Sequence, residues 1–191
     1  YGKSKLKAEG VFNGWAESEP DRNLSIIRFV VIFGEENKGN VHNLITQVAN
    51  NKFIMIGSGK NKKSMAYVGN VVKFLSQLSM SKGKNIFNYS DKPDMTANNL
   101  IELIRLELGM SASPLIRIPY WLGLVGGYFF DLFAMITGRT FPISSIRIKK
   151  FCANTVVSSD AVQATKFIAP YSLEEGLRRM IKNIKLANNP S

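Results

Sequence analysis

The sequence predicts an α/β fold, in which helices cover a mostly parallel sheet. Helical apolar spacing alternates along the chain with short, continuous apolar runs. The run LSIIRFVVIFG, residues 24–34, is β-branched and too continuous for a half-exposed strand, which is typical of a parallel strand covered on both faces. At 191 residues and 45% hydrophobic content, the chain can bury a core of its own, in one domain or at most two small ones.

The first part of the chain predicts a helix, a strand and a second helix. Residues 1–18 have one apolar face at helical spacing, and residues 24–34 follow as the buried strand. Residues 40–51, NVHNLITQVANN, then form a helix with one apolar stripe. The apolar positions of these two helices are Leu6, Ala8, Val11, Phe12, Trp15 and Ala16, then Val41, Leu44, Ile45 and Val48.

The following segments continue the alternation. FIMIG, residues 53–57, is a short strand, GSGKNKKS is a basic loop, and residues 65–78 begin as a strand and end as a helix. NIFNYS, residues 85–90, is another strand. Thr96 is the N-cap of a helix that Gly109 ends, and Ser172 with Glu175 forms the capping box of the last helix.

The stretch IPYWLGLVGGYFFDLFAMITG, residues 118–138, is the most apolar in the chain. Gly123 and Gly127 have the small-xxx-small spacing of packed helices. Arg117 bounds the stretch and Asp131 interrupts it, so it falls short of the roughly 18 uninterrupted apolar residues of a membrane span. We expect a helix that is buried or covered by a partner, with a membrane-surface contact as the alternative, and an end at Gly138 and Pro142.

Composition narrows the class of protein. With 25 Lys and Arg against 14 Asp and Glu, the net charge of +11 predicts an anionic partner: nucleic acid, an acidic membrane or a phosphorylated small molecule. The basic residues are scattered and match no nucleic-acid-binding motif, so nucleic acid is not the expected partner. A basic nucleic-acid-binding domain or a membrane-apposed interaction domain is the alternative class of function. One cysteine, Cys152, and one histidine, His42, are too few for a zinc site, and no disulfide can form within the chain. A reducing, cytoplasmic location is expected, since the start of the chain has no apolar signal segment.

The first five residues, YGKSK, suggest a catalytic pair. Tyr1 and Lys5 are four positions apart and share one face of the predicted helix. A nearby ammonium favours the phenolate and lowers the pKa of a tyrosine from about 10 toward the range of a general acid or base. The pair by itself is a weak motif.

The order of these motifs resembles the later half of the extended short-chain dehydrogenases/reductases, the NAD-dependent nucleotide-sugar epimerase/dehydratase family. The resemblance runs from Tyr1 to about Leu78 and resumes over residues 153–181, whereas residues 114–145 match nothing in it. The family's glycine-rich dinucleotide fingerprint and catalytic serine or threonine precede the tyrosine, and no G-x-G-x-x-G follows a strand in this sequence. The resemblance therefore implies the C-terminal half of an extended Rossmann-type epimerase/dehydratase, lacking the N-terminal dinucleotide-binding half. Residues 1–80 would end the Rossmann-like domain, and residues 81–191 would form the substrate-binding domain.

The resemblance also implies roles for individual residues. Tyr1 would be the acid/base, Lys5 would hold the nicotinamide ribose and tune Tyr1, and Val30 would lie against the nicotinamide. Lys63 stands where relatives often have an arginine for the diphosphate, and Arg147 is a second candidate phosphate contact. The implied substrate-binding residues are Asn40, Val41, Phe53, Ile54, Met55, Lys63 and Arg147.

The expected activity follows from the family. The cofactor would be NAD or NADP, bound mainly by the missing half, and the substrate a nucleotide-diphosphate sugar. The whole protein would be a homodimer without membrane association, and this chain alone would be inactive. Phe29 stands where proline is common and Val31 where many epimerases have asparagine, so 4-epimerase, dehydratase and 4-keto reductase remain open alternatives.

Overall fold

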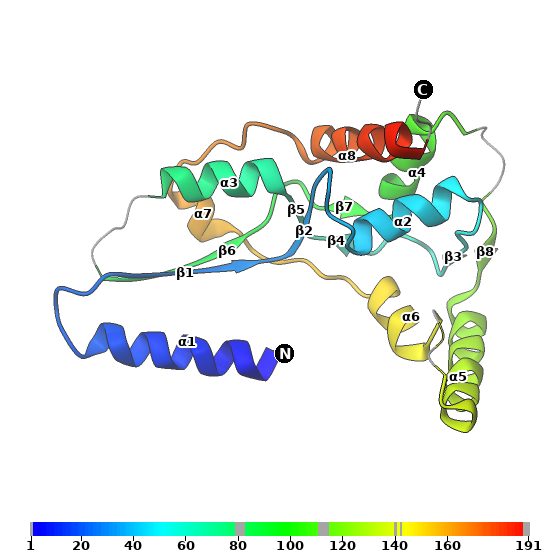
Figure 1. Cartoon of the computed structure of the whole chain (residues 1–191), viewed down its shortest axis with the longest axis horizontal. Helices are drawn as coiled ribbons and strands as arrows, with labels where there is room; N and C mark the ends of the chain where they lie inside the picture. Colours follow the sequence, from blue (N-terminus) through cyan, green and yellow to red (C-terminus); the bar gives the residue numbers. More distant parts are fainter. Residues whose placement is uncertain (1, 79–82, 111–114, 140, 142, 189–191) are drawn as a thin grey trace.

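The computed structural model describes residues 2–78, 83–110, 115–139, 141 and 143–188. Helix α1 (Gly2–Glu17) lies on one side of the strand pair β1 (Leu24–Phe29) and β6 (Lys84–Tyr89), and α3 (Val68–Gln77) and α7 (Asp160–Ala164) lie on the other (Figure 1). The two strands are parallel, in register from Leu24 opposite Lys84 to Phe29 opposite Tyr89.

Three shorter strand pairs complete the described sheets. β2 (Val31–Phe33) is parallel to β5 (Met65–Tyr67), and β3 (Met55–Ile56) is parallel to β8 (Arg117–Ile118). β4 (Lys62–Lys63) and β7 (Met95–Thr96) are antiparallel. The predicted α/β class with parallel pairing is thus confirmed, although the strand predicted at residues 53–57 is only two residues long and the basic loop contains β4.

The apolar run 24–34 differs from its prediction. It forms two strands that separate at Val30, whose backbone N–H donates to the Tyr89 carbonyl at 3.4 Å. The residues of β1 are half-buried or exposed, because among the described residues β1 and β6 form a sheet of two strands and β1 lies at its edge. Coverage of this strand on both faces was therefore a wrong prediction for the described residues.

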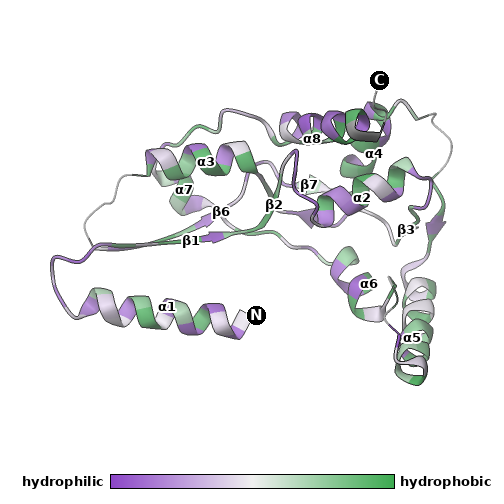
Figure 2. Ribbon diagram, in the orientation of Figure 1, coloured by the Kyte–Doolittle hydropathy of each residue, from purple (hydrophilic) through white to green (hydrophobic). Residues whose placement is uncertain are grey.

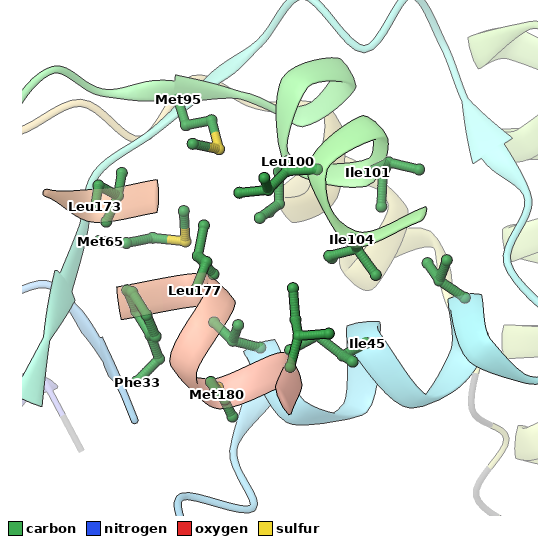
Figure 3. Packing of buried hydrophobic residues seen from close by; sticks show 14 of the residues in the cluster. Phe33, Ile45, Met65, Met95, Leu100, Ile101, Ile104, Leu173, Leu177 and Met180 are labelled. Atoms are coloured by element: carbon green, nitrogen blue, oxygen red, sulfur yellow. The ribbon is translucent and has the colours of Figure 1, made fainter. Parts of the chain in front are cut away.

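The main core lies between β2, β5 and three helices. α2 (Asn40–Ala49), α4 (Ala97–Glu107) and α8 (Leu173–Asn188) turn their apolar faces toward one another, as the close view in Figure 3 shows. Ile45, Ile104, Leu177 and Met180 are fully buried at 0% exposure. Since Phe33 and Met65 join residues from after position 81 in this core, the predicted parts 1–80 and 81–191 share one core. The boundary at residue 80 stays a prediction.

The predicted helix ends are confirmed. The Thr96 hydroxyl accepts a hydrogen bond from the backbone N–H of Asn99 at 3.1 Å, and Gly109 follows α4 with a φ of +69°. At the start of α8, the Glu175 N–H donates to the Ser172 hydroxyl at 3.1 Å and the Ser172 N–H donates to the Glu175 carboxylate at 3.2 Å. This is the reciprocal capping box that the sequence predicts.

A buried carboxyl connects β5, α3 and β6. Asp91 accepts hydrogen bonds from the Tyr67 N–H at 2.7 Å, the Asn70 side-chain amide at 3.0 Å and the Tyr89 hydroxyl at 3.0 Å. Asn70 in turn bonds both the N–H and the carbonyl of Tyr171. Burial raises the pKa of Asp91, and the three donors oppose this shift.

Helices α5 (Tyr120–Thr137) and α6 (Ser145–Cys152) project from the rest of the molecule (Figure 1). The buried residues of α5 are Gly123 and Gly127, and green hydrophobic positions recur along its length in Figure 2. The helix is therefore not buried within the described chain, because it contacts its neighbours through a glycine stripe and leaves most of its large side chains exposed. The other part of the prediction, coverage by a partner, stays a prediction. Gly138 ends α5 with a φ of +66°, as predicted, and Pro142 lies outside the described residues.

Candidate functional site

The predicted catalytic pair is described only in part. Tyr1 lies outside the described residues, and Lys5 is exposed on α1. Across from α1, the Arg28 guanidinium donates to both carboxylate oxygens of Glu9, at 3.0 and 2.5 Å. This bidentate ion pair connects α1 to β1 at a defined position, and the hydrogen bond from Arg28 lowers the pKa of Glu9.

The Arg28–Glu9 ion pair also indicates where Lys5 lies along β1. α1 and β1 run in opposite directions (Figure 1). Four helical residues advance about 6 Å and two strand residues about the same distance. Because Glu9 faces Arg28, Lys5 lies at the level of Val30, at the carboxyl end of β1. Ligands of open α/β sheets bind at this end of the strands.

The first residues of α2 have different surroundings. Asn40 is exposed at the helix start, whereas Val41 is buried in the core. Met55 in β3 is also fully buried. Any contact of Val41 or Met55 with a substrate would have to come from the backbone, because both side chains pack inside the protein.

Three predicted substrate residues line a single cavity of about 360 Å³. Phe53 and Ile54 come from the segment before β3, and Arg147 comes from α6. The aromatic rings of Phe53 and Phe151 meet edge to face at 6.0 Å on one wall. Most of the remaining lining is apolar and comes from α5, α6 and the segment between them, including Leu122, Gly123, Gly126, Phe130, Ile143 and Ile148.

Lys63 has a structural contact that the sequence did not indicate. Its ammonium donates to the carbonyls of Lys150 and Ala153, at 2.8 and 2.6 Å, and so caps the carboxyl end of α6. These bonds use two of its three N–H groups, which leaves at most one for a phosphate. Burial lowers the pKa of Lys63.

Sequence reasoning missed two features near these residues. The α5 wall of the cavity lies in the segment that matched nothing in the family, and its signal was the apolar run itself. The Tyr67 hydroxyl donates to Glu35 at 2.7 Å. Burial and then Glu35 raise the pKa of Tyr67 to about 12.

The sequence of the chain is similar to a bacterial epimerase. It is 46% identical over 185 residues, 95% of this chain and 56% of the relative, to the N-acetyl-α-D-glucosaminyl-diphospho-ditrans,octacis-undecaprenol 4-epimerase of Escherichia coli O157:H7. No family model matches the chain.

Solved structures of epimerases share the fold. The UDP-glucose 4-epimerase of Thermotoga maritima, solved with UDP-glucose, superposes with a TM-score of 0.68 at 16% identity, over 99% of this chain and 54% of that one. The UDP-glucose 4-epimerase of Thermus thermophilus, solved with NAD, gives a TM-score of 0.65 at 14% identity, over 97% of this chain and 53% of that one. The chain thus spans about half the length of the proteins it matches. The sequence relative and the shared fold confirm the resemblance to the extended short-chain dehydrogenases/reductases that act as sugar epimerases and dehydratases.

Proposed function

We propose that the chain is the substrate-side half of a nicotinamide-dependent sugar 4-epimerase whose substrate is a sugar joined through a diphosphate to a polyprenol. The observation that carries the proposal is the 46% identity, along 95% of this chain, to a relative named for that reaction. The half-length match to relatives supports a second, dinucleotide-binding half elsewhere in the whole protein.

The position of Lys5 fits this chemistry. An exposed ammonium at the carboxyl end of a parallel strand lies where a dinucleotide ribose binds in such folds. Bound NAD or NADP would supply hydride transfer at the sugar carbon. Tyr1 would take the proton from the sugar hydroxyl as hydride leaves the carbon, and would return the proton to the same oxygen when hydride comes back to the opposite face of the carbon. Lys5 would favour the phenolate and hold the ribose, and Val30 would border the nicotinamide.

The cavity supplies the substrate side. Arg147 offers a guanidinium for the diphosphate, and Asn40 offers an exposed amide at the start of α2. Phe53 and Ile54 form an apolar wall with α5. A wall of this kind suits the first isoprene units of a polyprenol. Val41, Met55 and the remaining N–H of Lys63 complete the proposed substrate contacts.

A nucleotide-diphosphate sugar is the second candidate substrate, because a structural neighbour holds UDP-glucose. The same cavity wall would then border the base. In either case we propose a homodimer, with α1 and its exposed Trp15 at or near the interface.

The substrate is tested with the protein at its natural length. N-acetylglucosaminyl-diphospho-undecaprenol in detergent and UDP-N-acetylglucosamine are each incubated with NAD, and the released sugars are separated to detect the 4-epimer. We expect turnover of the polyprenol substrate. Turnover of the UDP-sugar alone would select the second candidate, and turnover of neither would refute the proposal.

The catalytic roles are tested with three variants. Tyr1→Phe and Lys5→Met should each lower kcat by about a hundredfold or more, because each removes a group of the proton transfer. Lys3→Met, a matched change on the same exposed helix, should leave kcat within about twofold. Equal losses in all three variants would mean that α1 is only structural.

The isolated 191-residue chain should be inactive. Its sequence has no glycine-rich dinucleotide turn, so NAD should not bind tightly. Calorimetric titration with NAD measures this directly, and a micromolar affinity would contradict the expected division of the protein into two halves.

A further inference from the structure

The outward face of α5 is apolar and uncovered in the described part of the chain. Its side chains Trp121, Val125, Phe129 and Ile136 are 61–71% exposed, and Met135 is 80% exposed. An exposed helix of a soluble domain normally turns polar residues to the solvent. A contiguous apolar face of this kind marks a site that contacts a membrane or another protein.

The one residue of α5 that is charged at neutral pH, Asp131, lies on the opposite, protein-facing stripe. Gly123, Gly127 and Asp131 recur every four residues and so share one side of the helix. A side chain at Gly123 would meet Ile56, and one at Gly127 would meet Ser145. The Asp131 carboxylate accepts a hydrogen bond from the Ser145 N–H at 3.1 Å. The outward face is therefore free of charge because the charge of α5 is turned toward α6.

The charges around this face are basic. Residues 115–152 contain the basic side chains Arg117, Arg139, Arg147, Lys149 and Lys150, and their acidic side chain is Asp131. Lys149 donates to the Tyr128 hydroxyl at 2.8 Å and so stands at the edge of the aromatic face. Helices that lie in the interface of an anionic membrane have this composition: an apolar, aromatic face with lysine and arginine at its border.

We propose that α5 docks on an anionic phospholipid surface, lying in the interface with its outward face in the lipid. Among the described residues, α5 has the length and composition to cross a membrane. Its glycine stripe packs on α6 and Ile56, however, so an interfacial position fits the contacts. This reverses the sequence-based expectation of no membrane association.

If the substrate is a polyprenol, as the proposed function has it, the docking of α5 explains how the cavity receives this substrate. Leu122, Gly126 and Phe130 of α5 form part of the cavity wall that also holds Arg147. A polyprenol leaving this cavity would pass along α5 into the lipid, while the diphosphate stays at Arg147. The enzyme would therefore take its substrate from the membrane without extracting the whole chain into water.

Vesicle flotation tests the docking without any substrate. The protein at its natural length is mixed with phosphatidylcholine vesicles that contain or lack phosphatidylglycerol. Flotation should require phosphatidylglycerol and weaken in high salt. The affinity of the double variant Trp121→Glu/Phe129→Glu for these vesicles should be at least about tenfold lower, because two charges are placed on the lipid-facing side of α5.

A matched control separates this face from general surface hydrophobicity. Leu106→Glu/Leu186→Glu changes two leucines of similar exposure, 66% and 64%, on α4 and α8, and should float like the unchanged protein. Circular dichroism confirms that each variant folds. Equal flotation of both double variants overturns the proposal. A protein that does not float also overturns it, and light scattering then tells whether that protein is a monomer or a dimer.

Trp121 provides a second readout. Trp15 and Trp121 are the tryptophans of these 191 residues, so the signal of Trp121 in the protein at its natural length is measured as the emission that a Trp121→Phe variant loses. This emission should shift to the blue with anionic vesicles, and an unchanged spectrum overturns the proposal. Flotation with no turnover of the polyprenol substrate would instead leave the docking established and refute the proposed substrate.

Discussion

At the scale of the residue, the chemistry of this chain depends on a few polar side chains whose partners come from distant segments. Asn70 bonds the backbone of Tyr171, 101 positions later, and Lys63 bonds the carbonyl of Ala153, 90 positions later. Such contacts orient buried groups that would otherwise lack partners. They also explain why Lys63, which the family resemblance assigned to the diphosphate, has a structural contact.

Asp91 should tolerate asparagine better than alanine. Asp91→Ala leaves the buried donors of Tyr67 and Asn70 unpaired and should lower the free energy of unfolding by about 2–4 kcal/mol. Asp91→Asn keeps an oxygen for both donors and can donate to the Tyr89 hydroxyl, so it should cost about 1 kcal/mol. Urea unfolding measures both, and equal losses would mean that the negative charge itself is required.

Tyr67 should make stability fall in alkaline solution. Its pKa is raised from 10.0 to about 12 in the folded state, so the native protein holds this proton more tightly than the unfolded chain does. The corresponding stabilisation is present below pH 10 and is lost as the pH rises toward 12. Urea midpoints from pH 9 to pH 11 should fall less steeply for Tyr67→Phe, and parallel slopes would contradict the shifted pKa.

At the scale of the element, α5 shows how glycines decide which face of a helix is buried. Its two buried positions are Gly123 and Gly127, whereas Trp121, Val125 and Phe129 are more than 60% exposed. Small residues let backbones approach closely, which makes them the contact face even in a helix rich in phenylalanine. The apolar composition of residues 118–138 predicted burial of the large side chains, and the packing gives the opposite orientation.

Neighbouring glycines of α5 should respond oppositely to alanine. A Cβ at Gly127 would lie 2.8 Å from the backbone of Ser145, whereas a Cβ at Gly126 meets nothing within 4 Å. Gly126→Ala should stabilise the helix by up to about 1 kcal/mol, and Gly127→Ala should cost about 1–3 kcal/mol because α5 and α6 must separate. Thermal unfolding of both variants measures the difference, and a stabilising Gly127→Ala would contradict the close packing.

At the scale of the whole molecule, one core joins segments from both halves of the sequence. The cluster around Ile45, Ile104 and Leu177 contains residues from Phe33 to Ile184. The described chain should therefore unfold cooperatively around this core. The exposed faces of α1 and α5 lie outside it.

Leucines at two depths test this core. Leu177→Ala removes a side chain with 0% exposure and should cost about 2–5 kcal/mol. Leu106→Ala, at 66% exposure on the adjacent α4, should change stability by less than about 0.5 kcal/mol. Urea unfolding followed by circular dichroism measures both, and similar losses would contradict the assigned orientation of α4.

The sequence by itself determined the α/β class, the longer helices and the helix ends at Thr96, Gly109, Ser172 and Gly138, because periodicity and capping are local properties of the chain. It also carried the family resemblance through Tyr1 and Lys5. Only the tertiary structure decided that Phe53, Ile54 and Arg147 share a cavity, that Lys63 caps α6, and that the large side chains of α5 face outward. These features depend on contacts between residues about ninety positions apart, and on close glycine packing, which a one-dimensional apolar pattern does not encode.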